Sequence, residues 1–493
     1  MNSPFNEKRY KELLEGLEIS EVSFSYVKRS CEVFRLDSFY YSKEFLYDEY
    51  QIDSIKRERL RDLSSSILSF GAYSLNNFVE YRDRGIPFIR GVNLKNGILD
   101  FNDIIFIDED AHRLLWKSEV TPQTILLSMS GTIGDVAIAM PDYTYPMNSN
   151  QDIAKIRIND KVNTYYVYTF LLSRYGQNYL KREARGSVQQ HVFLSQMEDF
   201  NIPLPSASFQ KQVEKIVLSA HYNLSKSNTL FSELQDLIMG GLGLNNWQLR
   251  NGQVNVKSLK ESFLSSGRLD AEHYQVKYDE LEERIKTVPY KTIAEIQQFN
   301  ARGVQPDYVE DGNVSVVNSK HILEDGLDYD NFERATEAFW SSYERAHIEY
   351  GDILIYTTGA NIGRTQAYLK HNHALASNHV NILRVNGVNP IYLSLVLNSP
   401  IGRMQTEKFC TGSAQAEIYP NDIEKFIVPI LDEATQETIA LKVLECFAMK
   451  TDSKRLLNIA KEAVEIAISE NEGKAMQFIK ENENSKSFLN KIV

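Results

Sequence analysis

The chain has 493 residues, of which 43% are hydrophobic, 24% charged and 11% aromatic. This composition excludes disordered, collagen-like and low-complexity proteins, and the length predicts roughly two to four domains. The 66 acidic and 54 basic side chains give a net charge of −12, which weighs against a nucleic-acid-binding protein because surfaces that bind phosphates are usually basic.

The N-terminal residues lack the apolar run of a secretory signal, and no stretch of the chain approaches the ~18 consecutive apolar residues of a membrane-spanning helix. The three cysteines, Cys31, Cys410 and Cys446, are far apart, and the nine histidines show no paired ligand spacing. Neither a disulfide framework nor a zinc site is therefore expected. We expect a soluble protein of the reducing cytoplasm, without metal or membrane interaction.

Residues 1–209 are predicted to contain an N-terminal extension and a first domain built from short β-strands. The extension lies before Arg35, and the sequence assigns it no role. Runs of β-forming residues at 103–107, 125–129 and 153–158 are separated by turn residues. A helical stretch at 165–180 follows, and then a strand punctuated by Pro at 202–205.

Residues 210–245 are predicted to form a long helix and a linker. Eight positions alternate spacings of four and three, the a/d pattern of a coiled coil. They are Val213, Val217, Ala220, Leu224, Ser227, Phe231, Leu234 and Ile238. The polar Ser227 interrupts this apolar seam, and such polar layers can fix the register in which helices pair.

Residues 246–433 repeat the plan of the first domain, with β-like runs at 352–356 and 380–385, a helical stretch at 391–409 and a Pro-punctuated strand at 427–430. Residues 434–480 are predicted to form a second long helix, and 481–493 a tail. The second seam has the same register as the first: Ile439, Val443, Cys446, Lys450, Ser453, Leu457, Ala460 and Val464. The shared register favours an antiparallel pair whose polar layers meet. The alternative is two unrelated amphipathic helices that each lie on their own domain.

Short matches in constant order indicate a tandem duplication of roughly 230 residues. The matching pairs are Arg35-Leu36-Asp37 with Arg268-Leu269-Asp270, Gly131-Thr132-Ile133-Gly134 with Gly359-Ala360-Asn361-Ile362-Gly363, Gly186-Ser187-Val188-Gln189 with Gly412-Ser413-Ala414-Gln415, Phe200-Asn201-Ile202-Pro203 with Phe426-Ile427-Val428-Pro429, and Gln210 with Gln436. One match could arise by chance, but five in sequence indicate two copies.

Two similar domains at the ends of such helices would form a caliper. A helix of roughly 30 residues is about 45 Å long, which corresponds to ~13 base pairs of B-DNA. This geometry suits a split, asymmetric DNA site. A duplicated scaffold that holds two protein partners apart would have the same geometry.

These features together resemble the specificity subunit of type I restriction–modification systems. The resemblance rests on the tandem copy, on the Gly-x-Ile-Gly element at Gly131–Gly134 with its variant at Gly359–Gly363, and on the Gly-Ser-x-Gln loop that precedes a Pro-punctuated strand and a helix start containing Gln. It covers roughly residues 20–470. It implies an α+β protein with two tandem α/β target-recognition domains, separated by two long helices that form an antiparallel coiled coil with a pseudo-two-fold repeat. The second copy departs from the pattern at residues 427–430, which read Ile-Val-Pro-Ile in place of Ile-Pro-Leu-Pro.

The resemblance also implies a function, in which each target-recognition domain reads one half of a bipartite DNA sequence. The implied partners are double-stranded DNA, modification subunits, two in number, that carry S-adenosylmethionine and methylate adenine, and a restriction–translocation subunit. The chain itself has no Pro-Pro dipeptide for an adenine-methyltransferase motif and no Gly-x-x-x-x-Gly-Lys-Ser/Thr element for ATP hydrolysis. The Gly-rich run at 240–244 follows a helix and is typical of a helix C-cap. We therefore expect a non-catalytic subunit with no cofactor of its own.

Candidate DNA contacts combine basic side chains for phosphates with Arg, Gln, Asn, Ser or Thr for base edges. The Gly-Ser-x-Gln loops supply Lys181, Arg182, Arg185, Ser187, Gln189, Gln190 and His191, and in the second copy Lys408, Thr411, Ser413 and Gln415. The Gly-x-Ile-Gly elements supply Ser130, Thr132, Asn361 and Arg364, and a third group comprises Arg90, Asn93, Lys95, Asn318, Lys320 and His321. Each group also has a structural interpretation, as a tight turn, a sharp hairpin or a solvated strand edge.

Two other functions remain open at this point. One is the recognition subunit of a restriction–modification enzyme that cuts at a fixed distance from its site, and the other is a duplicated protein-interaction scaffold without a DNA role. The charge of −12 is unevenly distributed, since basic residues lie on the candidate loops while residues 324–344 and the last helix are acidic. We therefore expect the chain alone to bind DNA weakly, and tight, salt-sensitive binding only in the complex.

Overall fold

The computed structural model describes residues 6–30, 34–69, 79–186, 190–244, 254–412 and 415–483. Contacts divide them into two compact units, described separately below. Unit 1 contains the described residues up to Asn223 and from Asp452 onward, and unit 2 contains those between Leu224 and Thr451. Each long helix is thus shared between the units. This division differs from the consecutive domains expected from the sequence, because each part of a long helix packs with the unit to which it belongs.

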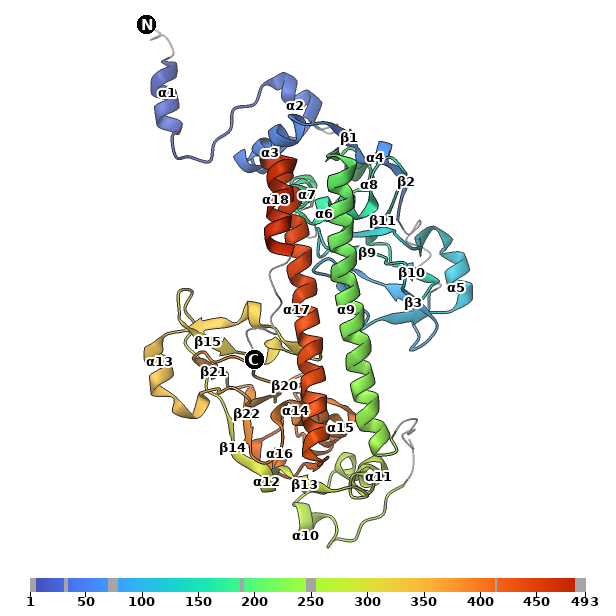
Figure 1. Ribbon diagram of the computed structural model, residues 1–493, viewed down its shortest axis with the longest axis vertical. Helices are drawn as coiled ribbons and strands as arrows, with labels where there is room; N and C mark the ends of the chain where they lie inside the picture. Colours follow the sequence, from blue (N-terminus) through green and yellow to red (C-terminus); the bar gives the residue numbers. More distant parts are fainter. Residues whose placement is uncertain are drawn as a thin grey trace. The chain divides into compact units, whose positions relative to one another are not determined.

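Unit 1 combines short strands with short helices (Figure 1). Its strands are β1 (Arg57–Arg59), β2 (Ser64–Leu68), β3 (Ile86–Ile89), β4 (Leu94–Lys95), β5 (Ile98–Leu99), β6 (Ile105–Ile107), β7 (Glu119–Val120), β8 (Ile125–Ser128), β9 (Val136–Ile138), β10 (Met147–Ser149), β11 (Ile153–Ile158) and β12 (Asn201–Pro203). Its helices are α1 (Glu7–Leu14), α2 (Phe24–Ser30), η1 (Phe39–Tyr41), α3 (Lys43–Asp53), α4 (Leu60–Leu63), η3 (Gly91–Asn93), α5 (Glu109–Leu114), η4 (Trp116–Ser118), α6 (Thr164–Leu172), α7 (Arg174–Glu183), α8 (Leu194–Glu198) and α18 (Glu472–Glu483).

Unit 2 has a similar content of short elements. Its strands are β13 (Tyr290–Thr292), β14 (Gln297–Arg302), β15 (Val314–Val317), β16 (Ile322–Leu323), β17 (Gly326–Leu327), β18 (Glu333–Ala335), β19 (Ile353–Tyr356), β20 (Thr365–Ala367), β21 (Ala374–Ala376), β22 (Val380–Val385) and β23 (Ile427–Pro429). Its helices are α10 (Phe263–Ser266), η5 (Ala271–Tyr274), α11 (Val276–Ile285), α12 (Ile293–Ile296), η6 (Ser319–His321), η7 (Tyr329–Asn331), α13 (Glu337–Ser342), η8 (Glu344–Ala346), α14 (Pro390–Asn398), α15 (Pro400–Phe409) and α16 (Pro420–Ile423).

The sheets of the two units have similar topologies, although the second sheet has four strands in unit 1 and three in unit 2. In unit 1 an antiparallel sheet has the order β2-β11-β8-β9, and a second sheet, β6-β3-β10-β7, contains the parallel pair β3 and β10. In unit 2 the antiparallel sheet has the order β14-β22-β19-β20, and the second sheet, β18-β15-β21, contains the parallel pair β15 and β21. The central strands β8 and β19 are apolar runs because both of their faces are covered.

The helical stretch predicted in each copy is two helices rather than one. In unit 1, α6 and α7 are separated by Ser173, and in unit 2, α14 and α15 are separated by Ser399. Both serines have extended backbone angles, and Pro400 disfavours helical angles at the residue before it. Asn163 and Asn389 cap the first helix of each pair, each accepting two backbone N–H groups.

The predicted long helices are α9 (Ala207–Gly241) and α17 (Glu433–Ser469). Seven of the eight positions of the first seam are buried, Phe231 being the half-buried exception, and six of the second, with Lys450 and Leu457 half-buried. The two helices are joined by hydrogen bonds in each unit: Asn223 Nδ2 donates to Asp452 Oδ2 (2.9 Å) in unit 1, and Ser227 Oγ donates to the Cys446 carbonyl (2.8 Å) in unit 2. The polar interruption at Ser227 is therefore satisfied by a hydrogen bond.

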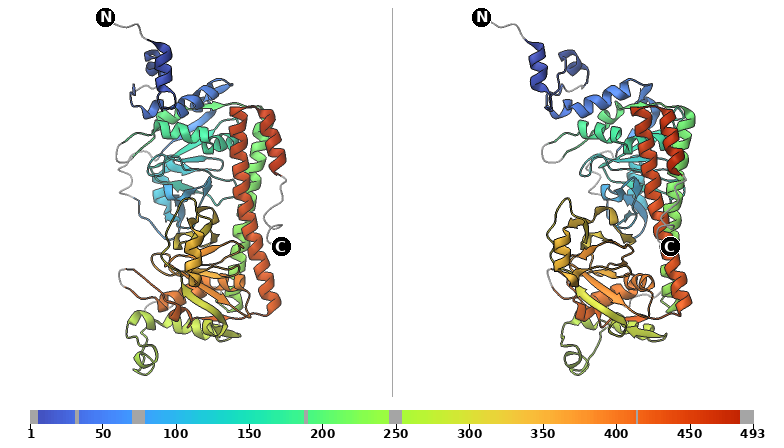
Figure 2. Two further views of the ribbon diagram at one scale, coloured as in Figure 1. Left: turned by 90° about the vertical axis from the view of Figure 1, so that its left-hand side faces the viewer. Right: turned by 60° about the vertical axis from the view of Figure 1, so that its left-hand side comes forward.

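Each unit packs its strands and short helices against its part of the long helices (Figure 2). In unit 1, α18 also lies against α9, since Glu483 accepts hydrogen bonds from Gln212 and Lys215. No helix among the described residues is both long and apolar enough to cross a membrane.

Candidate nucleic-acid interface

Two elements that the sequence singles out separately lie side by side in unit 1. Strand β8 leads through Ser130 into the turn Gly131–Gly134, and helix α7 leads into loop 1, defined here by the described residues 184–186 and 190–192. His191 forms antiparallel bridges with Ser130 and with Arg185. The backbone N–H of Val192 donates to the Met129 carbonyl at 2.9 Å. The Gly-x-Ile-Gly turn and loop 1 thus form one surface.

Unit 2 has the same arrangement. Strand β19 leads through Thr358 into the turn Gly359–Gly363, and helix α15 leads into loop 2, defined here by the described residues 410–412 and 415–418. Glu417 forms antiparallel bridges with Thr358 and Thr411, and the N–H of Ile418 donates to the Thr357 carbonyl at 3.0 Å. Glu417 therefore occupies the place that His191 has in unit 1.

The last glycine of each turn is required by the helix beside it. Gly134 has φ +96°, and a Cβ there would lie 2.7 Å from the Gln177 Oε1 of α7. Gly363 has φ +87°, and a Cβ there would lie 2.8 Å from the Thr406 Oγ1 of α15. Only glycine combines this backbone conformation with so close an approach. Each turn is thereby held against the helix that carries the loop.

Several predicted residues present their side chains to solvent on this surface. They are Thr132, Lys181 and Gln190 in unit 1, and Asn361, Thr411 and Gln415 in unit 2, with Arg364 half-buried. Within the described part of the chain Lys181 and Arg364 form no ion pair. Ser130 Oγ donates to Asp152 Oδ1 at 2.7 Å, which orients the start of the turn. The predicted residues Ser187, Gln189 and Ser413 lie outside the described residues.

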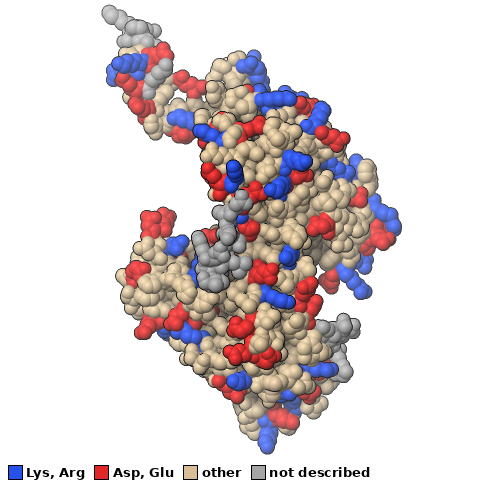
Figure 3. Space-filling model, viewed as in Figure 1, with Lys and Arg blue, Asp and Glu red and all other residues tan. Residues whose placement is uncertain are grey.

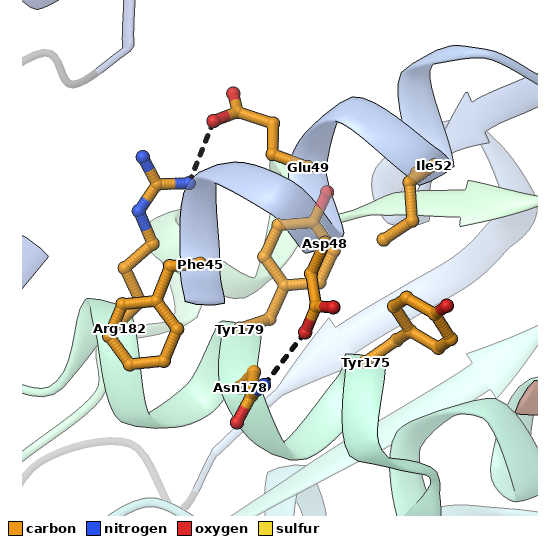
Figure 4. Close-up of a pocket in the computed structure, with 8 residues that line it drawn as sticks. All are labelled: Phe45, Asp48, Glu49, Ile52, Tyr175, Asn178, Tyr179 and Arg182. Atoms are coloured by element: carbon orange, nitrogen blue, oxygen red, sulfur yellow. Dashed lines mark hydrogen bonds and ion pairs between the residues drawn. The ribbon is translucent and has the colours of Figure 1, made fainter. Parts of the chain in front are cut away.

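Arg182 has a structural position. Its side chain is 4% exposed, it forms an ion pair with Glu49 of α3 at 3.0 Å, and its Nε donates to the Tyr40 carbonyl at 2.9 Å. Figure 4 shows this ion pair beside the hydrogen bond from Asn178 of α7 to Asp48 of α3 (2.7 Å). Since its donors are used within the protein, we leave Arg182 out of the proposed DNA surface. Lys408 of α15 is also paired within the protein, with Glu282, although it is only half-buried.

The third predicted group caps two short 3₁₀ helices. Asn93 Oδ1 accepts the N–H of Arg90 (2.9 Å), and His321 Nδ1 accepts the N–H of Asn318 (2.9 Å). Both capping side chains are buried, and His321 also faces Glu333. Asn93 and His321 therefore shape the connections between strands and do not face solvent.

The cations of this group also have partners within the protein. Arg90 Nη2 donates to the Asp103 carbonyl (2.6 Å), Lys95 pairs with Asp100 (2.6 Å), and Lys320 pairs with Glu333. The lysines remain exposed. A phosphate would have to compete with these carboxylates for them.

One pair of functional candidates was missed by sequence reasoning. Phe193 at the exit of loop 1 is 50% exposed, and Tyr419 at the exit of loop 2 is 44% exposed. The Arg302 guanidinium lies over the Tyr419 ring at 4.4 Å, while the His191 ring lies 4.7 Å from that of Phe193. The two aromatics are separated by 226 residues, the spacing of the two Gly-Ser-x-Gln motifs, which was the signal that could have found them.

Glu417 is held as a carboxylate. The Tyr419 hydroxyl donates to its Oε2 at 2.6 Å and Arg302 Nη1 to its Oε1 at 2.5 Å, and these contacts hold the pKa of Glu417 below its usual value. Loop 2 thus contains a fixed negative charge where loop 1 contains a histidine. The two loops offer different chemistry on the same framework.

Charges of both signs are mixed over the face drawn in Figure 3. No group of three or more His, Cys, Asp or Glu that could hold a metal ion was found within the described ranges. The arrangement can offer hydrogen-bond donors and acceptors and exposed aromatics on two similar surfaces, one in each unit.

Comparison with known proteins gives these surfaces a family context. Residues 59–230 match the family described as type I restriction modification DNA specificity domain. The type I restriction enzyme MjaIX specificity subunit of Methanocaldococcus jannaschii is 22% identical over 343 residues, which are 67% of this chain and 72% of that protein.

Two solved structures are also similar. The type I restriction-modification S subunit from M. genitalium has a TM-score of 0.38 at 14% identity, with 86% of this chain and 95% of that chain covered. The HsdS subunit from Thermoanaerobacter tengcongensis has a TM-score of 0.29 at 13% identity, with 84% and 97% covered. The family match shows that residues 59–230 of this chain are similar to the type I restriction modification DNA specificity domain.

Proposed function

We propose that the chain is the sequence-specific DNA-binding subunit of a type I restriction–modification complex, and that it recognises a bipartite, asymmetric target. The observation that carries this proposal is the recurrence of one surface in both units. In each, a Gly-x-Ile-Gly turn and a Gly-Ser-x-Gln loop are joined by the same backbone bridges, with different exposed side chains. Two similar but non-identical readers suit two different half-sites.

The proposed readers use general rules of DNA recognition. Gln and Asn side chains pair with base edges in the major groove, while Lys and Arg neutralise phosphates. Unit 1 offers Lys181 of α7 and Gln190 of loop 1, and unit 2 offers Asn361, Arg364 and Gln415. Phe193 and Tyr419 add exposed aromatic surface at the same places in the two units.

The long helices are proposed to act as a spacer. We interpret α9 and α17 as an antiparallel coiled coil that relates two copies by a pseudo-two-fold repeat. The matching seams, the hydrogen bonds at Ser227 and Asn223, and the similar sheet topologies support this interpretation. The spacer length between the half-sites would then follow from helix length.

The reactions are proposed to occur on partner subunits. Two modification subunits would carry S-adenosylmethionine and methylate adenine in each half-site, and a restriction–translocation subunit would complete the complex. This chain would supply recognition and no catalysis. Because its net charge is −12, partner surfaces are expected to contribute most of the phosphate contacts.

Genome-wide mapping of methylated adenine, in cells with and without this chain, tests the proposal. A split, asymmetric methylated motif should be present with the chain and absent without it. Methylation that does not change on deletion would contradict the proposal and favour the protein-interaction scaffold. A motif that disappears together with cleavage at a fixed distance from it would identify the fixed-distance enzyme instead.

A further inference from the structure

We propose that the Arg-Leu-Asp turn at the start of each unit positions that unit's recognition loop by holding the end of the helix that leads into it. The turns are Arg35-Leu36-Asp37 and Arg268-Leu269-Asp270. Arg35 and Arg268 are thus positioning residues. The inference rests on the proposed function in one respect, that loops 1 and 2 read DNA.

In unit 1 the turn contacts the last turn of α7. Arg35 is held flat by Asp37, through Nε to Oδ2 (2.8 Å) and Nη2 to Oδ1 (3.0 Å). Its remaining nitrogen, Nη1, donates to the Arg182 carbonyl at 2.7 Å. That carbonyl is one of the last four of α7, which have no partner within the helix, and loop 1 begins two residues later.

Unit 2 repeats these contacts at the end of α15. Arg268 Nε donates to Asp270 Oδ1 at 2.8 Å, and Nη2 contacts the other carboxylate oxygen. Arg268 Nη1 donates to the Phe409 carbonyl at 3.2 Å and lies 3.4 Å from that of Cys410. Cys410 is the C-cap of α15 and the first residue of loop 2.

A tyrosine fixes each turn from the other side. The Tyr41 hydroxyl donates to the Arg35 carbonyl at 2.9 Å, and the Tyr274 hydroxyl donates to the Arg268 carbonyl at 3.0 Å. Both tyrosines follow their arginine by six residues. In both units, therefore, a turn and a short 3₁₀ helix contact the C-terminal end of the helix that leads into the loop, α7 in unit 1 and α15 in unit 2.

The chemistry of the contact explains why these two residue types recur. A cation is favoured at a helix C-terminus, where carbonyl oxygens carry partial negative charge. The Arg hydrogen bond lowers the pKa of Asp37 and of Asp270, so both carboxylates stay charged and hold the guanidinium plane. The Leu between them contributes little to either core, since Leu36 is 73% and Leu269 is 71% exposed.

In unit 1 helix α3 adds a second support to α7. Asn178 donates to Glu44 (2.8 Å) and Asp48 (2.7 Å), and Arg182 pairs with Glu49, as Figure 4 shows for the Asp48 and Glu49 contacts. Helix α3 thereby joins the framework of loop 1.

Hydrogen exchange of the full-length chain tests the inference without DNA. The reporters are the paired amides of Arg185 and His191 in loop 1, and of Thr411 and Glu417 in loop 2. Arg35→Ala should accelerate exchange at the loop 1 reporters by at least roughly tenfold, the factor for one lost hydrogen bond to a charged group, and leave loop 2 unchanged. Arg268→Ala should do the reverse, and the controls Leu36→Ala and Leu269→Ala should change neither.

Conservative variants separate positioning from general destabilisation. Arg35→Lys retains the charge but loses the two-point contact with Asp37, so loop 1 exchange should be intermediate between those of the wild type and Arg35→Ala. Unchanged loop exchange in both Arg35→Ala and Arg268→Ala would overturn the inference. Equal acceleration by either variant in both loops and in the core strands β8 and β19 would also overturn it.

Methylation mapping of the same variants, assembled with the modification subunits, separates this inference from the proposed function. Arg35→Ala should relax one half of the motif, and Arg268→Ala the other. Local acceleration of exchange with an unchanged motif would refute loop-based reading while the positioning role stands. An altered motif with unchanged exchange would refute the positioning role.

Discussion

Lys155 is a lysine buried in the antiparallel sheet of unit 1. It is 2% exposed on β11, and its Nζ donates to Ser149 Oγ (3.0 Å) and the Ile153 carbonyl (3.2 Å), with no carboxylate among these acceptors. Burial lowers its pKa to about 7. The corresponding residue of β22, paired with β19 as Lys155 is with β8, is the apolar Ile382. The fold therefore accommodates an aliphatic side chain at this position.

This difference predicts a pH-dependent stability. In the unfolded chain Lys155 has its ordinary pKa of about 10.5, so between about pH 7 and 9 the unfolded state binds more protons and stability rises with pH. The Lys155→Ile variant loses this contribution. The free energy of unfolding of the wild type, relative to that of the variant, should therefore rise by about 2 kcal/mol from pH 7 to pH 9. The slope approaches about 1.4 kcal/mol per pH unit once Lys155 is fully neutral in the folded state. Urea denaturation at both pH values measures it, and a constant difference would show that Lys155 is not a buried, neutral amine.

At the same scale, residue type in the sequence did not predict which of the candidate side chains face solvent. Arg182 and His321 carry the residue types of DNA contacts, but Arg182 is buried against α3 and His321 caps a 3₁₀ helix. Their partners, Glu49 and Asn318, are polar residues whose pairing depends on the packed chain. Phe193 and Tyr419 are exposed although aromatic residues usually pack in cores, and only their common spacing connects them.

At the scale of elements, Gln210 of α9 fastens α6 to the long helix. Its Oε1 accepts the N–H of Asn163 (2.9 Å), and its Nε2 donates to the Pro205 carbonyl (2.9 Å). Gln436 of α17 makes the same contacts with Asn389 (2.9 Å) and Leu431 (2.7 Å) in unit 2. The Gln that marks the start of both predicted helices is therefore a joint between helix and domain.

Gln210→Ala should destabilise unit 1 by about 1–3 kcal/mol, because the N–H of Asn163 and the Pro205 carbonyl lose their partner at a largely buried site. Hydrogen exchange of the slowest amides in β8 and β11 reports this change, and those in β19 and β22 should be unaffected. The neighbouring Lys211→Ala, at an exposed position of the same helix, is the control. Equal effects of the two substitutions would contradict the joint.

The long helices were predictable because their pattern is local and periodic, and most of the seam residues are buried as the spacing predicts. The sheets were not predictable in the same way. The parallel pair β3 and β10 joins residues 86–89 to residues 147–149, and no local pattern specifies such a partner. The break at Ser173 within one helical stretch was also missed, since Ser alone is a weak helix terminator.

At the scale of the whole molecule, the proposed spacer can be lengthened. Inserting one heptad into α9 and one into α17, at facing positions, adds about 10.5 Å to each helix, or about three base pairs of B-DNA. We expect the methylated motif of the complex to keep both half-sites and gain a longer spacer. An insertion in α9 alone, which breaks the match between the seams, is the control and should reduce methylation. A lengthened pair that changes the half-sites but not the spacer would contradict the spacer role.

The central claim is that each unit reads a different half of one DNA site. Its most direct measurement is the methylated motif produced by the complex that contains Gln190→Ala or Gln415→Ala, two exposed residues on corresponding surfaces. Each substitution should relax the base preference of one half-site, by about 1–3 kcal/mol where the amide makes a two-point base contact, and the two should affect different halves. Relaxation of the same half by both, or of both halves by either, would contradict the claim.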